Sequence, residues 1–136
     1  MDNSLLISTY IRNILSRNEE LKEMLTDSVN GQLKIFPLAA RTGTEYPYVV
    51  VQRNNISPSY TKDGCYENEI DITVLIVHTS YDKCVYIANI IRNILDLCRY
   101  RDNDVYIPRI ELSTATEGIS DEAFIQELRF SVSMAN

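Results

Sequence analysis

The clearest pattern in the chain is an apolar–polar alternation that changes into a helical repeat. Every second residue from Ile70 to Ile76 is apolar, which predicts a strand with one buried face. Leu75 and Val77 make the far end apolar on both sides, so we expect that end to be covered twice. Ser80 is a good N-cap, and a helix is predicted from there to about Arg99. Its core-facing residues are Cys84, Ile87, Ala88, Ile91, Ile94, Leu95 and Cys98.

The start of the chain carries a second helical pattern. Its spacing predicts a helix over residues 4–16, with an apolar stripe of Ile7, Tyr10, Ile11, Ile14 and Leu15. Asn18 is followed by Glu19 and Glu20, which is typical of an N-cap with an acidic first turn. A helical segment is therefore expected from there to about Thr26. The sequence leaves open whether it continues the first helix or breaks from it.

Four other segments have the character of strands. They are Lys34–Leu38, Val49–Gln52, Ile107–Ser113 and Phe124–Met134. Three consecutive valines in the second segment indicate a strand buried on both faces. The order of elements is then α-β-β-β-α-β-β. It predicts the α+β class: an N-terminal helical pair, a mostly antiparallel sheet of four to five strands, and a central crossover helix.

The segment from Asn54 to Tyr66 shows no periodicity and reads as irregular. It contains Pro58 and a Lys-Asp-Gly turn. Connections of this length are uncommon without a function, so we expect an extended hairpin or a flap. Residues 117–122 are expected to form a second, shorter loop.

Composition narrows the class of protein. The 136 residues, 45% of them hydrophobic, are enough for one domain with its own core, here taken as residues 1–136. A net charge of −6 disfavours a protein that binds nucleic acid through phosphates. No apolar run reaches the ~18 residues of a membrane span, and the N-terminal sequence does not resemble a secretion signal. Three cysteines without a close pair suit a reducing compartment.

Residues with catalytic potential are few and separated. His78 is the only histidine, and we interpret it as structural or solvated. Cys84 and Cys98 are on the predicted core face of the helix, whereas Cys65 lies in the irregular segment with no activating neighbour. Asp102 and Asp104 are interpreted as a solvated turn rather than calcium ligands. We therefore expect no catalytic site, cofactor, metal or small-molecule substrate.

Tyrosines and a second helical stripe suggest contact surfaces. Nine tyrosines is a high number for this length, and several flank the predicted loops. They are interpreted equally well as protein-contact residues or as ordinary cover for the sheet edge. In the central helix, Tyr86, Ile90 and Leu97 align beside the core face. They indicate either a wide core face or a helix that also packs on a neighbouring subunit.

The order and spacing of these elements resemble a known family across residues 5–134. A helical pair leads to Ile35-Phe36-Pro37, and a loop then opens onto Pro47-Tyr48-Val49-Val50. A long polar hairpin, the alternating strand, a helix and two terminal strands follow. This layout resembles the tail-completion, or tail terminator, proteins of long-tailed phages, also called head–tail joining proteins. The chain departs from the family by lacking a proline before Gly43 and an aromatic residue within the central strand.

The resemblance implies a structural, non-enzymatic role. Such proteins form a ring, typically a hexamer, that caps the tail tube and meets the head connector, while DNA passes through as cargo. It implies a location at the head–tail junction of the virion, after synthesis in the bacterial cytoplasm. Subunit contacts are then expected at Tyr86, Ile90 and Leu97 and at the sheet edge. Contacts with the tail tube or connector are expected at Asn55, Pro58, Tyr60, Lys62, Asp63 and Tyr66.

Two other functions remain open from the sequence. The first is a non-catalytic module, of host or prophage origin, that binds a protein partner and forms no ring. The second is a small hydrolase built on Cys65 or His78, which is disfavoured because no base–nucleophile pair is evident. Oligomeric state separates the ring protein from the binding module. A pocket joining either residue to a carboxylate would favour the hydrolase.

Overall fold

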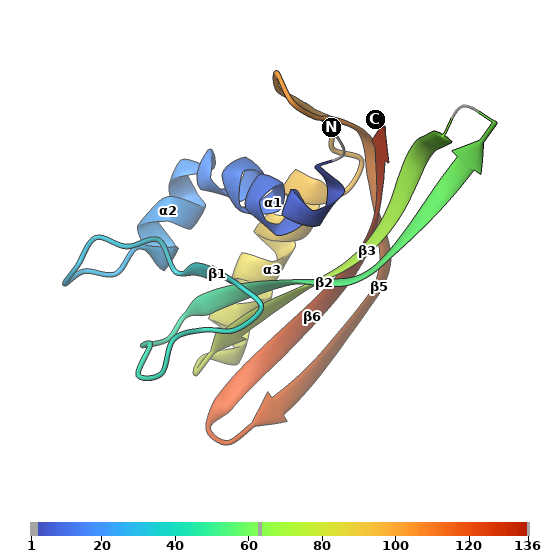
Figure 1. The fold of residues 1–136 in the computed structure, drawn as a ribbon. Helices are drawn as coiled ribbons and strands as arrows, with labels where there is room; N and C mark the ends of the chain where they lie inside the picture. Colours follow the sequence, from blue (N-terminus) through green and yellow to red (C-terminus); the bar gives the residue numbers. More distant parts are fainter. Residues whose placement is uncertain (1–2, 63, 136) are drawn as a thin grey trace.

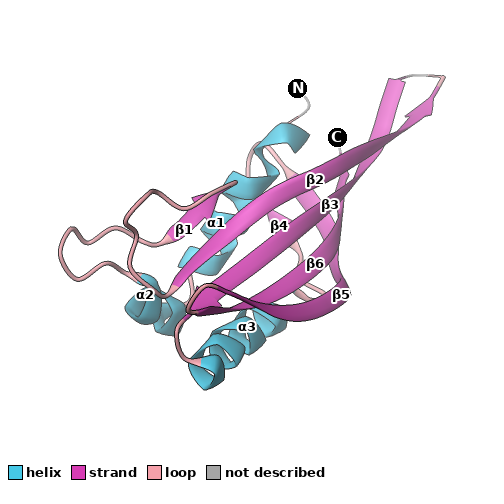
Figure 2. Cartoon of the chain, turned by 90° about the horizontal axis from the view of Figure 1, so that it is seen from below, coloured by secondary structure: helices cyan, strands magenta, loops and turns pink. Residues whose placement is uncertain are grey.

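The computed structural model describes residues 3–62 and 64–135; for Thr61, Cys65 and Tyr66 it describes the backbone alone. The helical elements are η1 (Ser4–Leu6), α1 (Ile7–Ser16), α2 (Glu19–Leu25) and α3 (Tyr81–Leu95). The strands are β1 (Ile35–Pro37), β2 (Tyr48–Thr61), β3 (Gly64–His78), β4 (Tyr100–Arg101), β5 (Tyr106–Ser120) and β6 (Ala123–Ala135). The helices lie together on one face of a strongly twisted sheet (Figure 1, Figure 2).

The sheet is larger than the sequence predicts, and it is mixed. Its order is β1-β2-β3-β6-β5-β4, with six strands in the described part of the chain instead of four to five. The pair β1–β2 is parallel, with Phe36 opposite Val50, and the other pairs are antiparallel. The α+β class is confirmed. The added strand, β4, has two residues, so no alternating pattern could reveal it.

The two long hairpins are the part of the sheet that the sequence pattern revealed least. Strand β2 continues to Thr61, so the prediction of an irregular segment from Asn54 is wrong and the extended hairpin is confirmed. Strand β5 likewise continues to Ser120, through most of the predicted second loop. Both segments are polar, and backbone pairing with β3 or β6 makes them strands without an apolar alternation. Register shifts interrupt the pairing near Asn54 in β2 and near Ser113 in β5.

The core lies between the helices and one face of the sheet. All five residues of the predicted α1 stripe are buried, and Ile70, Ile72, Val74 and Ile76 of β3 are fully buried against them. Phe130 on β6 lies opposite Ile72 and fills the centre of this layer. The three valines of β2 are buried, as predicted. One face of the twisted sheet and the three helices α1, α2 and α3 thus share one hydrophobic cluster.

Helix boundaries follow their capping residues. The Asn18 side chain accepts from the Leu21 amide at 2.9 Å, which begins α2 as a separate helix after α1. Ser80 accepts from Lys83 at the start of α3, as predicted. The predicted end of α3 at Arg99 is wrong, because the helix ends at Leu95. Leu97 has a positive φ of 65°, and its amide donates to Ile110 of β5 at 2.7 Å.

Candidate assembly surfaces

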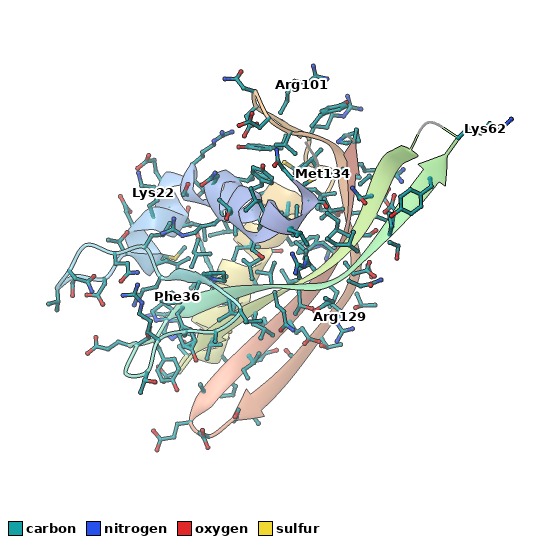
Figure 3. All side chains as sticks on the ribbon, viewed as in Figure 1. Lys22, Phe36, Lys62, Arg101, Arg129 and Met134 are labelled. Atoms are coloured by element: carbon teal, nitrogen blue, oxygen red, sulfur yellow. The ribbon has the colours of Figure 1, made fainter. Side chains whose placement is uncertain are left out.

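The first candidate surface is the arm formed by the distal halves of β2 and β3. Beyond the short β1, β2 is an edge strand, and its tip extends away from the helices (Figure 1). Lys62 lies at the far end of the arm (Figure 3). Tyr60 is 72% exposed, and Pro58 is exposed on an edge strand, where proline blocks unwanted strand pairing. The arm thus presents an aromatic ring and a cation near its tip.

The predicted contact loop falls mostly on this arm. Asn55 donates to Ser57 within β2, and Pro58, Tyr60 and Lys62 follow it toward the tip. Asp63 lies outside the described residues, as do the side chains of Tyr66 and Cys65. At the base of the arm, Asn54 donates to Thr73 at 2.6 Å. This hydrogen bond joins the bulged position of β2 to β3.

The predicted second stripe of the central helix is not continuous. Tyr86 is 47% exposed on α3, and its hydroxyl donates to Glu20 of α2. Ile90 is half-buried against the core. Leu97 lies beyond the end of α3 and is 72% exposed. Tyr86 and Ile90 are therefore one helical turn apart, whereas Leu97 belongs to the connection that leads to β4.

His78 lines a small, largely apolar cavity between α2 and α3. The cavity has a volume of ≈ 320 Å³, and its lining residues are Met24, Pro47, His78, Lys83, Tyr86 and Ile87. Nδ1 of His78 accepts from the Ser80 amide at 3.2 Å, which orients the ring at the end of β3. Partial burial lowers the pKa of His78, and the cations of Lys83 and Lys34 lower it further. This lining brings no carboxylate or thiol to His78.

Asp102 and Cys84 have local structural partners. Asp102 accepts from the amides of Asp104 and Val105, which makes the turn that was predicted there. Cys84 is buried and donates to the Ile76 carbonyl, and burial raises the pKa of this thiol. Within the described residues, no group of three or more histidine, cysteine, aspartate or glutamate side chains could hold a metal. In the same residues, no helix has the length and apolar character to cross a bilayer.

The sheet face opposite the helices is polar and rich in carboxylates. Strand register directs Glu67, Glu69 and Asp71 of β3 to this face, together with Glu111 of β5 and Glu127 of β6. The same register places Arg109 and Arg129 there, and Figure 3 shows Arg129 on the side away from the helices. Each arginine lies near a glutamate, at 3.3 Å from Glu111 and 3.5 Å from Glu127 respectively. Acidic groups thus outnumber basic ones on this face.

Glu69 is held on this face by two hydrogen bonds. It accepts from Ser133 at 2.6 Å and from Ser131 at 3.2 Å, both on the adjacent strand β6. These hydrogen bonds fix the position of the carboxylate on this face.

Comparison with known proteins finds similarity among solved structures. No family model matches the sequence, and no curated protein is significantly similar to it. Among solved structures, the fold is similar to a chain from the "Virion of native gene transfer agent (GTA) particle". The TM-score is 0.77 at 11% sequence identity, over 95% of this chain and 94% of that one. The likeness shows a shared fold across almost the whole length of both chains.

Sequence reasoning missed two surface features of this fold. One is the cavity beside β1, to which residues from α1, β1 and the following loop contribute. The other is the exposed tip of the β5–β6 hairpin, which was predicted as a plain loop. Isolated apolar Ile119 between polar residues was the available signal for the tip. No signal in the sequence links residues as distant as Arg12 and Arg41 in one cavity.

Proposed function

We propose that this protein is a structural component of a phage-type virion that forms a ring at the end of the tail tube and joins it to the head connector. The observation that carries the proposal is the shared fold with a chain of the gene transfer agent virion, matched over nearly all of both chains. The order of elements that resembles tail terminators agrees with this proposal. In this role the chain works through surfaces and needs no reaction centre.

The arm is our candidate for contact with the tail tube or the connector. It projects beyond the helices, and its exposed Tyr60 can bury a large ring while keeping its hydroxyl solvated. Lys62 adds a cation at the tip. We extend the proposal to the other predicted contact residues, Asn55, Pro58, Asp63 and Tyr66. Tyr86, Ile90 and Leu97 remain our candidates for contacts between subunits.

The acid-rich sheet face suits a protein past which DNA slides. Lysine and arginine neutralise phosphates and release counterions, which gives strong binding at low salt. A face dominated by carboxylates repels phosphates, so DNA that passes it is not retained. We propose that DNA is only passing cargo. Retention of duplex DNA by the purified protein at low salt would contradict this part of the proposal.

Native mass and particle images test the ring directly. We expect multi-angle light scattering, over a wide concentration range, to show a closed oligomer, with a hexamer as the expected size. Negative-stain images of the same samples should show a central hole. Where the protein alone is monomeric, the tail-tube protein from the same genome is added as template. Absence of a ring in both samples would contradict the proposal.

The arm contact is tested with a matched pair of variants. We expect Tyr60→Ala combined with Lys62→Ala to weaken binding to the tube protein at least tenfold while leaving the protein folded. Val29→Ala combined with Lys22→Ala is the control, since both residues are exposed on other elements. Equal binding by the two double variants would exclude the arm as the contact. Circular dichroism checks that both variants remain folded.

A second candidate function is a binding module that forms no ring. The observation that favours it is the cavity of ≈ 320 Å³ beside His78 and Tyr86, which has room for one apolar side chain of a partner. A monomer at every concentration, with or without tube protein, together with retention of one partner in a pull-down, would support this alternative. A ring would exclude it.

A further inference from the structure

A cavity lies at the β1 edge of the sheet, beside α1. Its volume is ≈ 480 Å³, and Ile35, Phe36 and Val51 give it an apolar floor. Arg12 and Arg41 are the charged residues in its lining, which contains no carboxylate. Nε of Arg12 donates to the Ile35 carbonyl at 3.1 Å, which holds this arginine against the strand. The cavity therefore combines an apolar floor with a positive rim.

Both arginines of the rim are available for an acidic partner. In the described part of the chain, neither has a carboxylate within ion-pair distance. Arg41 also lines a neighbouring cavity together with Asp27, whose carboxylate accepts from the Val29 and Asn30 amides instead of forming an ion pair with Arg41. The rim thus keeps its positive charge.

The tip of the β5–β6 hairpin has complementary properties. Ile119 is 66% exposed, and the two turn residues after Ser120 are Asp121 and Glu122. Neither carboxylate has an ion-pair partner among the residues described here. The tip is thus an exposed apolar side chain next to two unpaired negative charges.

The hairpin tip is also held in place. Glu117 accepts from the Tyr81 hydroxyl at 2.8 Å and from Gln126 at 2.9 Å, which ties β5 to α3 and β6. Phe124 packs edge-on against the Tyr81 ring. A surface that is already ordered loses less conformational entropy when it binds. The tip is therefore suited to enter a cavity as a rigid unit.

The tip and the cavity lie at different positions along the strand order of one sheet. The cavity is beside β1, the first strand in the sheet order, and the tip belongs to β5 and β6, toward the other edge. A contact between the two must join different surfaces of two copies. Repeated contacts of this heterologous type form a ring when the rotation closes.

We propose that the β5–β6 tip of one copy docks into the cavity beside β1 of the next copy. Ile119 then lies on the apolar floor, while Asp121 and Glu122 face Arg12 and Arg41. This inference rests on the proposed function, because it specifies how the ring closes. It adds a subunit contact at a different place from Tyr86, Ile90 and Leu97.

A charge-reversal cycle tests the contact. We expect Glu122→Lys and Arg41→Glu each to weaken self-association about tenfold, since each places like charges opposite one another. The double variant restores opposite charges and should recover most of the wild-type affinity. Glu23→Lys and Arg99→Glu are the controls, because they make the same charge changes at exposed sites outside the cavity. Light scattering against concentration measures all five proteins and the wild type.

Removing the apolar contact gives an independent check. Ile119→Ser should weaken association at least tenfold, whereas Val29→Ser, at another exposed apolar residue, should leave it unchanged. Both sites are exposed in the single chain, so neither variant should impair folding.

The outcomes separate this contact from the function. A wild-type ring that all these variants leave intact would overturn the contact and leave the proposed function standing. A wild type that is monomeric at every concentration would also overturn it, since both surfaces are present in the free chain; binding to tube ends then tests the function separately. Variants that lose tube binding but keep self-association would show the tube protein to be the occupant, which again overturns the contact.

Discussion

The two faces of the sheet differ at neighbouring residues of the same strands. On the helix side, Ile72 of β3 lies opposite Phe130 of β6, and both are fully buried. One residue earlier on β3, Asp71 lies opposite Ser131 on the other face, and there Asp71 is exposed and Ser131 half-buried. The backbone is equally well paired in both places. The difference shows that one face stabilises the fold while the other is left for charge and contact.

The largest expected effect is on the helix side. Phe130→Ala should lower the free energy of unfolding by about 3–5 kcal/mol, because it removes a large buried ring and leaves a cavity. Arg129→Ala, the adjacent residue on the other face, is the matched control and should change it by less than about 0.5 kcal/mol. Urea unfolding followed by circular dichroism measures both. Similar losses in the two variants would contradict the division between the faces.

The next effect concerns the end of α3, also on the helix side. The Asp96 carboxylate accepts from the Leu112 amide at 3.0 Å and so ties the helix end to β5. Asp96→Ala should lower the free energy of unfolding by about 1.5–3 kcal/mol, the usual contribution of a hydrogen bond to a charged group. Asp96→Asn keeps an acceptor and should retain about half of that contribution. Equal losses of unfolding free energy in both variants would show that the hydrogen bond does not account for the contribution of Asp96.

The same region shows why some of the fold was predictable and some was not. The stripes of α1 and α3 and the alternation of β3 were visible because side-chain periodicity follows burial. The end of α3 was misplaced because Asp96 and Leu97 are held by hydrogen bonds to β5, which is distant in sequence. Local helical spacing continues to Cys98, and a tertiary contact overrides it.

The polar hairpins show the opposite case, in which backbone pairing forms a strand without side-chain periodicity. Residues such as Asn55 and Thr116 form strands because their backbone pairs with β3 or β6, although no apolar face marks them. The residues expected at the tip of the first hairpin, including Tyr60 and Lys62, are exposed, although the strand that leads to them was not predicted. The cavity that joins Arg12 to Arg41 depends on how β1 packs beside α1, and no local pattern encodes it.

On the polar face, a smaller effect is expected from the serines that hold Glu69. Ser133→Ala should lower the free energy of unfolding by about 1 kcal/mol, because it removes a hydrogen bond of 2.6 Å from a buried hydroxyl. Ser131→Ala removes the longer bond of 3.2 Å from a half-buried site and should have a smaller effect. Urea unfolding of both variants under one buffer condition gives the comparison. The reverse order would contradict the assignment of Ser133 as the main partner of Glu69.

The smallest expected effect is a dependence of stability on pH that arises from His78 at the end of β3. This residue lines the cavity between α2 and α3. Burial lowers the pKa of His78 from its ordinary value of 6.5, so the unfolded chain binds more protons than the folded one as pH falls below that value. The contribution of neutral His78 is therefore complete above pH 6.5 and is lost as pH falls through the lower pKa of the folded state. Protonation also removes Nδ1 as the acceptor for Ser80.

His78→Gln keeps a polar side chain without this titration and should flatten the stability profile. Urea unfolding between about pH 7.5 and 5.5 isolates the effect, since most carboxylates titrate below that range. The wild type should lose more stability than the variant across this interval, by less than the loss expected for Ser133→Ala. Identical slopes would show that the cavity leaves His78 as well hydrated as in the unfolded chain. A steeper pH dependence of stability in the variant would show that a group other than His78 controls it. The apolar cavity would then make no contribution to the pH dependence of stability.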